Sequence, residues 1–146
     1  LDYPLVYRLK RERPDLTVVV NGGVADLDAA EAHLANGVDG VMLGRAAYHD
    51  PGLLGAVDRR LFGEGRDMEP RAAVKAYLPY VQARLDEGVR LAAMTRHMLG
   101  LFHGRPGART WRRIMTVESI RPGAGVEVIE QALEAVAEAP ALEPAG

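Results

Sequence analysis

The chain has 146 residues, 48% of them hydrophobic and 26% charged, with a formal net charge of -2. These values exclude a disordered chain and suit one domain with a core, or parts of two. There is no cysteine, which excludes disulfides, cysteine-bound zinc and a thiol nucleophile within these residues. No apolar run approaches the roughly 20 residues that span a bilayer, so we expect no membrane contact. The lack of cysteine fits a cytoplasmic setting.

The N-terminal part predicts alternating strands and helices. Residues 5–13 predict a helix that ends before Pro14, because the residue before a proline disfavours helical geometry. The β-branched run 16–20 predicts a strand buried on both faces. Residues 26–36 predict a helix with an aspartate N-cap, and 40–43 predict a second buried strand. This pattern has the length of a right-handed βαβ unit.

Two parallel strands alone leave both sheet edges open, so we expect partner strands outside this sequence. The chain also begins at Leu1 within an apparent helix, so we expect it to be a piece of a longer protein. Alternating βα units indicate a doubly wound sheet or a (β/α)8 barrel. Only helices follow the second strand. The pattern therefore predicts an α/β part in residues 1–62, which consists of the last two βα units of a TIM barrel, followed by an all-α domain.

The sequence from residue 51 onward predicts only helices. Residues 51–60 predict a short helix, and the polar connector 62–69 predicts the domain boundary. We expect a helical domain in residues 70–137 and a mobile tail in residues 138–146. The expected helices of that domain are 70–87, 91–102, 108–117 and 126–137.

Glycine-bearing turns follow both predicted strands. Asn21-Gly22-Gly23 follows the first strand and Gly44-Arg45 the second. Glycine lets the backbone approach a ligand closely, and arginine can bind phosphate oxygens through two parallel hydrogen bonds. TIM barrels frequently build a phosphate site from their last two strand-end loops. The turns therefore predict a phosphate site, although such residues also serve ordinary turns, and flavin mononucleotide (FMN), a sugar phosphate or a nucleotide would all fit.

The histidines indicate a ligand site less clearly than the glycine turns do. His33 is predicted to be a packing or surface residue of the helix between the strands. His49 follows the second turn closely enough to face a ligand, although a loop histidine is more often solvated. Because the chain has only four histidines and no carboxylates clustered at ligand spacing, we expect no metal site.

Arginine is concentrated in the predicted helical domain. The segment 84–121 contains eight arginines against three acidic residues, whereas residues 126–146 contain five glutamates and no basic residue. Arg109, Arg112 and Arg113 are spaced to share one helix face, with Trp111 toward the core. A basic face suits a phosphodiester backbone or exposed bases, and the alternative is a solvated or internally paired face. Since only Glu118 lies near, the spacing favours nucleic acid.

Three motifs carry a family resemblance that extends from residue 1 to about residue 137. They are Asn21-Gly22-Gly23, the run 39–48 from Asp-Gly-Val-Met-Leu-Gly-Arg to Tyr48, and the run 100–113 that ends in Trp-Arg-Arg. The chain resembles the C-terminal half of bacterial tRNA-dihydrouridine synthases, most closely the A subfamily. The first two motifs also occur loosely in other flavin barrels, and the third is more discriminating.

The resemblance implies a barrel that carries FMN, followed by a helical tRNA-binding domain. We expect the full-length protein to be monomeric. It implies that NADPH reduces the flavin, which passes a hydride to the C5=C6 bond of a uridine in tRNA. By position, the FMN phosphate would be held by Asn21, Gly22, Gly23, Gly44 and Arg45. Arg109 and Arg112 match positions that contact tRNA in this subfamily.

The resemblance also implies a proton-donating cysteine on an earlier barrel loop, and this sequence contains no cysteine. We therefore expect no catalytic residue in this chain and no reduction of uridine by the chain alone. One alternative is another FMN- or phosphate-binding barrel oxidoreductase acting on a small molecule, which would leave the arginine helix without a role. Another is a non-catalytic RNA-binding module, which predicts no flavin even in the longer protein.

Overall fold

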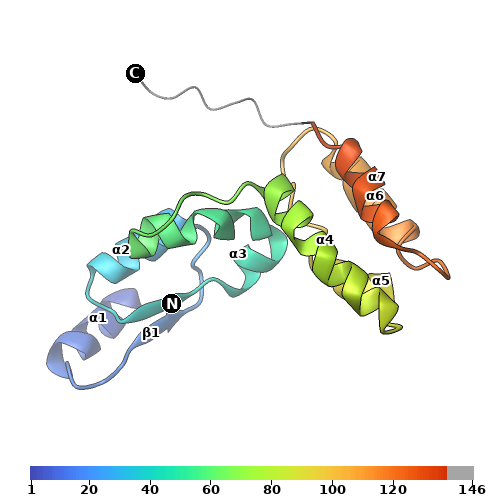
Figure 1. The fold of residues 1–146 in the computed structure, drawn as a ribbon. Coiled ribbons are helices and arrows are strands. Elements are labelled where there is room, and N and C mark those ends of the chain that lie inside the picture. The colour runs from blue at the N-terminus through green and yellow to red at the C-terminus, as the bar shows by residue number, and fades with distance from the viewer. Residues whose placement is uncertain (138–146) are drawn as a thin grey trace. The chain divides into compact units, whose positions relative to one another are not determined.

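The computed structural model describes residues 1–137, so the predicted mobile tail 138–146 lies outside the described residues. Contacts between Cα atoms divide the chain into two compact units. The first unit comprises residues 1–69, and the helical unit begins at Pro70. Figure 1 shows the first unit in blue to green and the helical unit in yellow-green to red. Every helix among residues 1–137 is too short or too polar to span a bilayer.

The first unit contains one parallel pair of strands with a helix between them. Val20 of one strand lies opposite Val41 of the other, which confirms the predicted parallel pairing. The elements in order are α1 (Tyr3–Glu12), β1 (Val19–Asn21), α2 (Leu27–Ala35), β2 (Gly40–Met42), α3 (Gly44–His49), the 3₁₀ helix η1 (Pro51–Ala56) and the π-helix η2 (Asp58–Phe62).

Local capping explains where these helices begin and end. Asp2 accepts a hydrogen bond from the Leu5 N–H at 3.0 Å, and Asp26 accepts one from the Ala29 N–H at 2.8 Å. Each carboxylate satisfies one of the N–H groups that lack a partner at a helix start. Gly37 follows α2 with a φ of 90°, a conformation that costs glycine little.

The prediction of strands buried on both faces is wrong for the described residues. Val20 is buried beneath α1 and α2, but Val19 is 54% exposed and Met42 is 49% exposed. The two strands of the described residues form a sheet whose other face has no covering layer. Burial of that face needs a tertiary partner, which a β-branched sequence pattern alone cannot supply.

The segment after β2 also differs from expectation. The predicted Gly44-Arg45 turn is the beginning of a short helix, α3, and the single helix predicted for 51–60 is divided between η1 and η2. Gly55 lies directly against the Met68 backbone. A Cβ on Gly55 would overlap the Met68 carbonyl oxygen, so this position has no room for a side chain. This close backbone contact accompanies tighter 3₁₀ geometry in η1.

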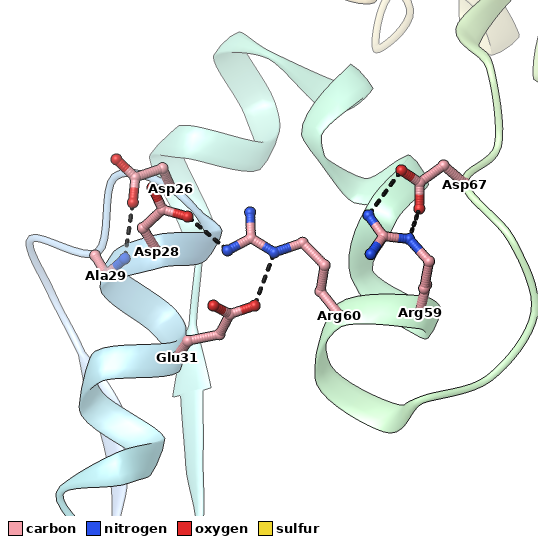
Figure 2. A network of polar contacts seen from close by, with 7 residues as sticks. All are labelled: Asp26, Asp28, Ala29, Glu31, Arg59, Arg60 and Asp67. Carbon is pink, nitrogen blue, oxygen red and sulfur yellow. Dashed lines mark hydrogen bonds and ion pairs between the residues drawn. The ribbon is translucent and has the colours of Figure 1, made fainter. Parts of the chain in front are cut away.

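Arginine side chains connect η2 to its neighbours (Figure 2). Arg60 donates from Nε to Glu31 at 2.7 Å and from Nη2 to Asp28 at 2.5 Å, and both acceptors lie on α2. Arg59 makes a two-pronged pair with Asp67, with its shorter bond at 2.6 Å. The Arg60 contacts hold η2 against the helix that connects the two strands, and the Arg59 pair holds the connector at Asp67 against η2.

The helical unit is built around one aromatic core. Its helices are α4 (Pro70–Asp86), α5 (Leu91–Thr95), α6 (Ala108–Val117) and α7 (Val126–Glu134). Trp111 is fully buried, its ring meets Phe102 edge-on at 4.8 Å, and its Nε1–H donates to the Met98 carbonyl at 3.2 Å. A buried tryptophan with its polar atom satisfied anchors such a core.

Two of the predicted helices in this unit are too long. The helix predicted for 91–102 ends at Thr95, and the chain continues in turns, among them Met98 N–H to the Thr95 carbonyl at 2.9 Å. Two glycines in this stretch, Gly100 and Gly104, disfavour a continued helix. The helix predicted for 126–137 ends at Glu134, and the Ala137 N–H beyond it donates to the Pro106 carbonyl at 3.4 Å.

Candidate functional site

The two glycine turns line one pocket of about 530 Å³ at the carboxyl ends of β1 and β2. The structure therefore brings together all five residues predicted to form the phosphate site. The lining residues are Asn21, Gly22, Gly23, Val24, Ala25, Met42, Gly44, Arg45, Ala46 and His49. None of these side chains is acidic.

The backbone of the first turn is open toward a ligand. Gly22 has a φ of 135° and Gly23 a φ of 70°, values that side-chain-bearing residues rarely adopt. Within the part of the chain that the structure describes, neither N–H group donates a hydrogen bond to another backbone group. Free N–H groups in a turn without side chains can bind an anion.

The second turn contributes a charge. Arg45 lies in the first turn of α3, is exposed, and forms no hydrogen bond or ion pair with any described side chain. The residue before this helix, Leu43, supplies no side-chain cap. The first N–H groups of an α-helix have no partner within the helix, and in α3 no side chain of the preceding residue caps them. An uncompensated guanidinium beside open N–H groups fits a phosphate monoester.

The structure also shows what surrounds the pocket. His49, which the sequence placed within reach of a ligand, lines it from the last turn of α3. His33 is a packing residue, as predicted, because it is 7% exposed and its Nδ1 lies 2.6 Å from the Tyr7 hydroxyl. Sequence reasoning missed Tyr3, whose hydroxyl donates to the Gly22 carbonyl at 2.8 Å. No local signal could have found this contact, since 19 residues separate the partners.

A second candidate site is the basic face of α6, formed by Arg109, Arg112 and Arg113. All three are exposed, whereas Trp111 and Ile114 are buried, which confirms the predicted division of this helix into two faces. None of the three arginines forms a hydrogen bond or ion pair with a side chain among residues 1–137.

Other arginines of the helical unit are paired. Arg121 forms an ion pair with Glu118, and Arg84 forms one with Glu87. Glu118, the acidic residue that directly follows α6, is thus engaged with Arg121 and does not neutralise the basic face. Among residues 1–137, no group of three or more potential metal-ligating side chains is present.

Comparison with known proteins places the chain in a family. The family model described as dihydrouridine synthase (Dus) matches residues 1–138. The tRNA-dihydrouridine(20/20a) synthase of Xanthomonas campestris pv. campestris is 55% identical over 133 residues, which cover 90% of this chain and 39% of that protein. The enzyme of the same name from Escherichia coli strain K12 is 51% identical over 139 residues, which cover 94% of this chain and 40% of that protein.

The chain belongs to the dihydrouridine synthase family. It spans about 40% of the length of the curated relatives that it matches.

Proposed function

We propose that this chain is part of a tRNA-dihydrouridine synthase of the A subfamily, which uses FMN and NADPH to reduce a uridine of tRNA to 5,6-dihydrouridine. The observation that carries the proposal is the convergence of both glycine turns and Arg45 on one pocket in a member of this family. The relatives are named for positions 20 and 20a, and we propose these uridines as the targets.

The pocket residues fit the phosphate of FMN. Positive-φ glycines leave room for the phosphate beside open N–H groups, and Arg45 supplies a positive charge with no described partner. In this proposal Asn21, Gly22, Gly23, Gly44 and Arg45 hold that phosphate and thereby fix one end of the cofactor. Bound FMN would supply hydride transfer, and NADPH would be its reductant. The chain contains no cysteine to donate the second proton, so we propose that it is inactive alone.

The helical unit would bind tRNA. Arg109 and Arg112 lie on an exposed, uncompensated face, and such a face can replace counterions on a phosphodiester backbone. We assign residues 1–62 to the last two βα units of a TIM barrel and residues 70–137 to the tRNA-binding domain. We propose that the whole protein acts as a monomer in the cytoplasm.

The test uses the protein at its full natural length and tRNA from cells that lack dihydrouridine. We expect a purified yellow protein that forms dihydrouridine at positions 20 and 20a when NADPH is added. An enzyme for small molecules would show no salt-dependent tRNA binding, and a binding module would contain no flavin. Either result would contradict the proposal.

A further inference from the structure

Tyr3 makes a contact that connects α1 to the pocket. Its hydroxyl donates to the Gly22 carbonyl at 2.8 Å, and its ring lies 4.5 Å from the ring of His33 in edge-on contact. The Asp2 cap fixes the start of α1 at this residue. Tyr3 is therefore held from two sides, by its helix and by a buried histidine.

The hydrogen bond sets the orientation of the peptide between Gly22 and Gly23. A trans peptide is planar, with its C=O and N–H pointing in opposite directions, and the described residues contain no cis peptide. When Tyr3 holds the Gly22 carbonyl on the α1 side, the Gly23 N–H must point away from α1. Both glycines line the pocket, and among the described residues the Gly23 N–H donates to no backbone group.

We propose that Tyr3 is a positioning residue for the phosphate pocket and acts by aiming the Gly23 N–H at the bound phosphate. This inference rests on the proposed function. Glycine accepts φ of either sign, so a peptide between two glycines can turn over at little cost. The reversed peptide would present a carbonyl oxygen to the phosphate and repel it. The Tyr3 hydroxyl prevents that reversal.

The packing around Gly23 supports this role. A Cβ on Gly23 would overlap the Tyr3 hydroxyl oxygen, so the turn and the hydroxyl fit together only without a side chain at that position. Tyr7 offers a matched control from the same helix. Its hydroxyl contacts Nδ1 of the same His33 at 2.6 Å, whereas within residues 1–137 it forms no hydrogen bond with the glycine turn.

The experiment compares FMN with riboflavin, which lacks the phosphate, in the apo form of the full-length protein. Affinities are measured by flavin fluorescence titration for wild type, Tyr3→Phe and Tyr7→Phe. For Tyr3→Phe we expect FMN affinity to fall about three- to tenfold, the worth of one ordinary hydrogen bond, with riboflavin affinity unchanged. Tyr7→Phe should keep the wild-type ratio of the two affinities.

The ratio within one variant separates positioning from a general loss of structure, because loosened packing would weaken both flavins. A wild-type ratio in Tyr3→Phe would overturn the inference while leaving the proposed function intact. If wild type binds both flavins equally, the phosphate site is wrong and the inference fails with it. Absence of dihydrouridine formation despite a changed ratio would instead count against the proposed reaction alone.

Discussion

Arg60 on η2 donates from Nε to the carboxylate of Glu31 on α2 at 2.7 Å, and 29 residues of sequence separate the two (Figure 2). This hydrogen bond is the main reason why the pKa of Glu31 is lowered. The Glu31 carboxylate in turn raises the pKa of Arg60. The Arg60 side chain is 26% exposed and the Glu31 side chain 42%, so water screens the pair substantially.

This pair predicts a pH-dependent contribution to stability. Because the pKa of Glu31 is lower in the folded state, its stabilisation is present above the unfolded-state value of about 4.3 and is lost as the pH falls through the folded value. We expect Arg60→Met to be slightly less stable than wild type at pH 7, with a smaller difference at pH 3. Thermal unfolding at both values measures this. Arg8→Met serves as the control. The ion pair of Arg8 with Glu12 is highly exposed, so this variant should have the wild-type stability at both pH 7 and pH 3.

Arg45 should contribute specifically to binding the phosphate of FMN. Loss of one charged hydrogen-bond donor costs about 1.5–3 kcal/mol, or roughly 10- to 150-fold in affinity. We expect Arg45→Ala to weaken FMN by this amount and to leave riboflavin unchanged, as measured by fluorescence titration. Arg66→Ala, which removes another exposed arginine of the first unit, should leave both unchanged. Equal FMN affinity in Arg45→Ala and wild type would remove this residue from the site.

The basic face of α6 should determine tRNA affinity. Replacing both Arg109 and Arg112 with alanine should weaken tRNA binding and reduce the slope of log affinity against log salt by about 1 for each tRNA phosphate that is no longer neutralised. FMN content should stay at the wild-type level. The double variant of Arg11 and Arg66 removes the same charge from the first unit and is the control. Unchanged tRNA affinity in the α6 variant would contradict the assignment.

Two glycines with similar backbone angles should respond differently to substitution. Gly104 has a φ of 73° with open space around its absent Cβ, whereas Gly107 has a φ of 86° and a Cβ there would overlap the Ala135 carbonyl oxygen. We expect Gly104→Ala to cost about 1–2 kcal/mol for its left-handed backbone. Gly107→Ala should cost about 2–5 kcal/mol, because overpacking adds to the backbone term. Urea denaturation followed by circular dichroism measures both, and equal costs would contradict the close packing.

Features set by local sequence could be predicted. The Asp26 cap, the end of α4 before Gly88 and the buried side of α6 all follow from residues within a few positions of one another. The convergence of the two glycine turns on one pocket was also predictable, because neighbouring parallel strands end at the same edge of a sheet.

Features set by distant contacts could not be predicted. The exposed face of β1 depends on which layers cover it, and the residues of the strand do not determine those layers. The contact of Tyr3 with Gly22 and that of Arg60 with Glu31 join residues far apart in sequence. Tertiary packing determines such contacts, and local secondary-structure propensity does not predict them.

Trp111 is the single tryptophan of the chain and is fully buried in the helical unit. Within these 146 residues, tryptophan emission therefore reports on the helical unit alone, while flavin fluorescence would report on the pocket of the first unit. In one sample the two wavelengths would give two separate unfolding midpoints. A shift of the Trp111 midpoint when FMN is added would measure the free energy that couples the two units.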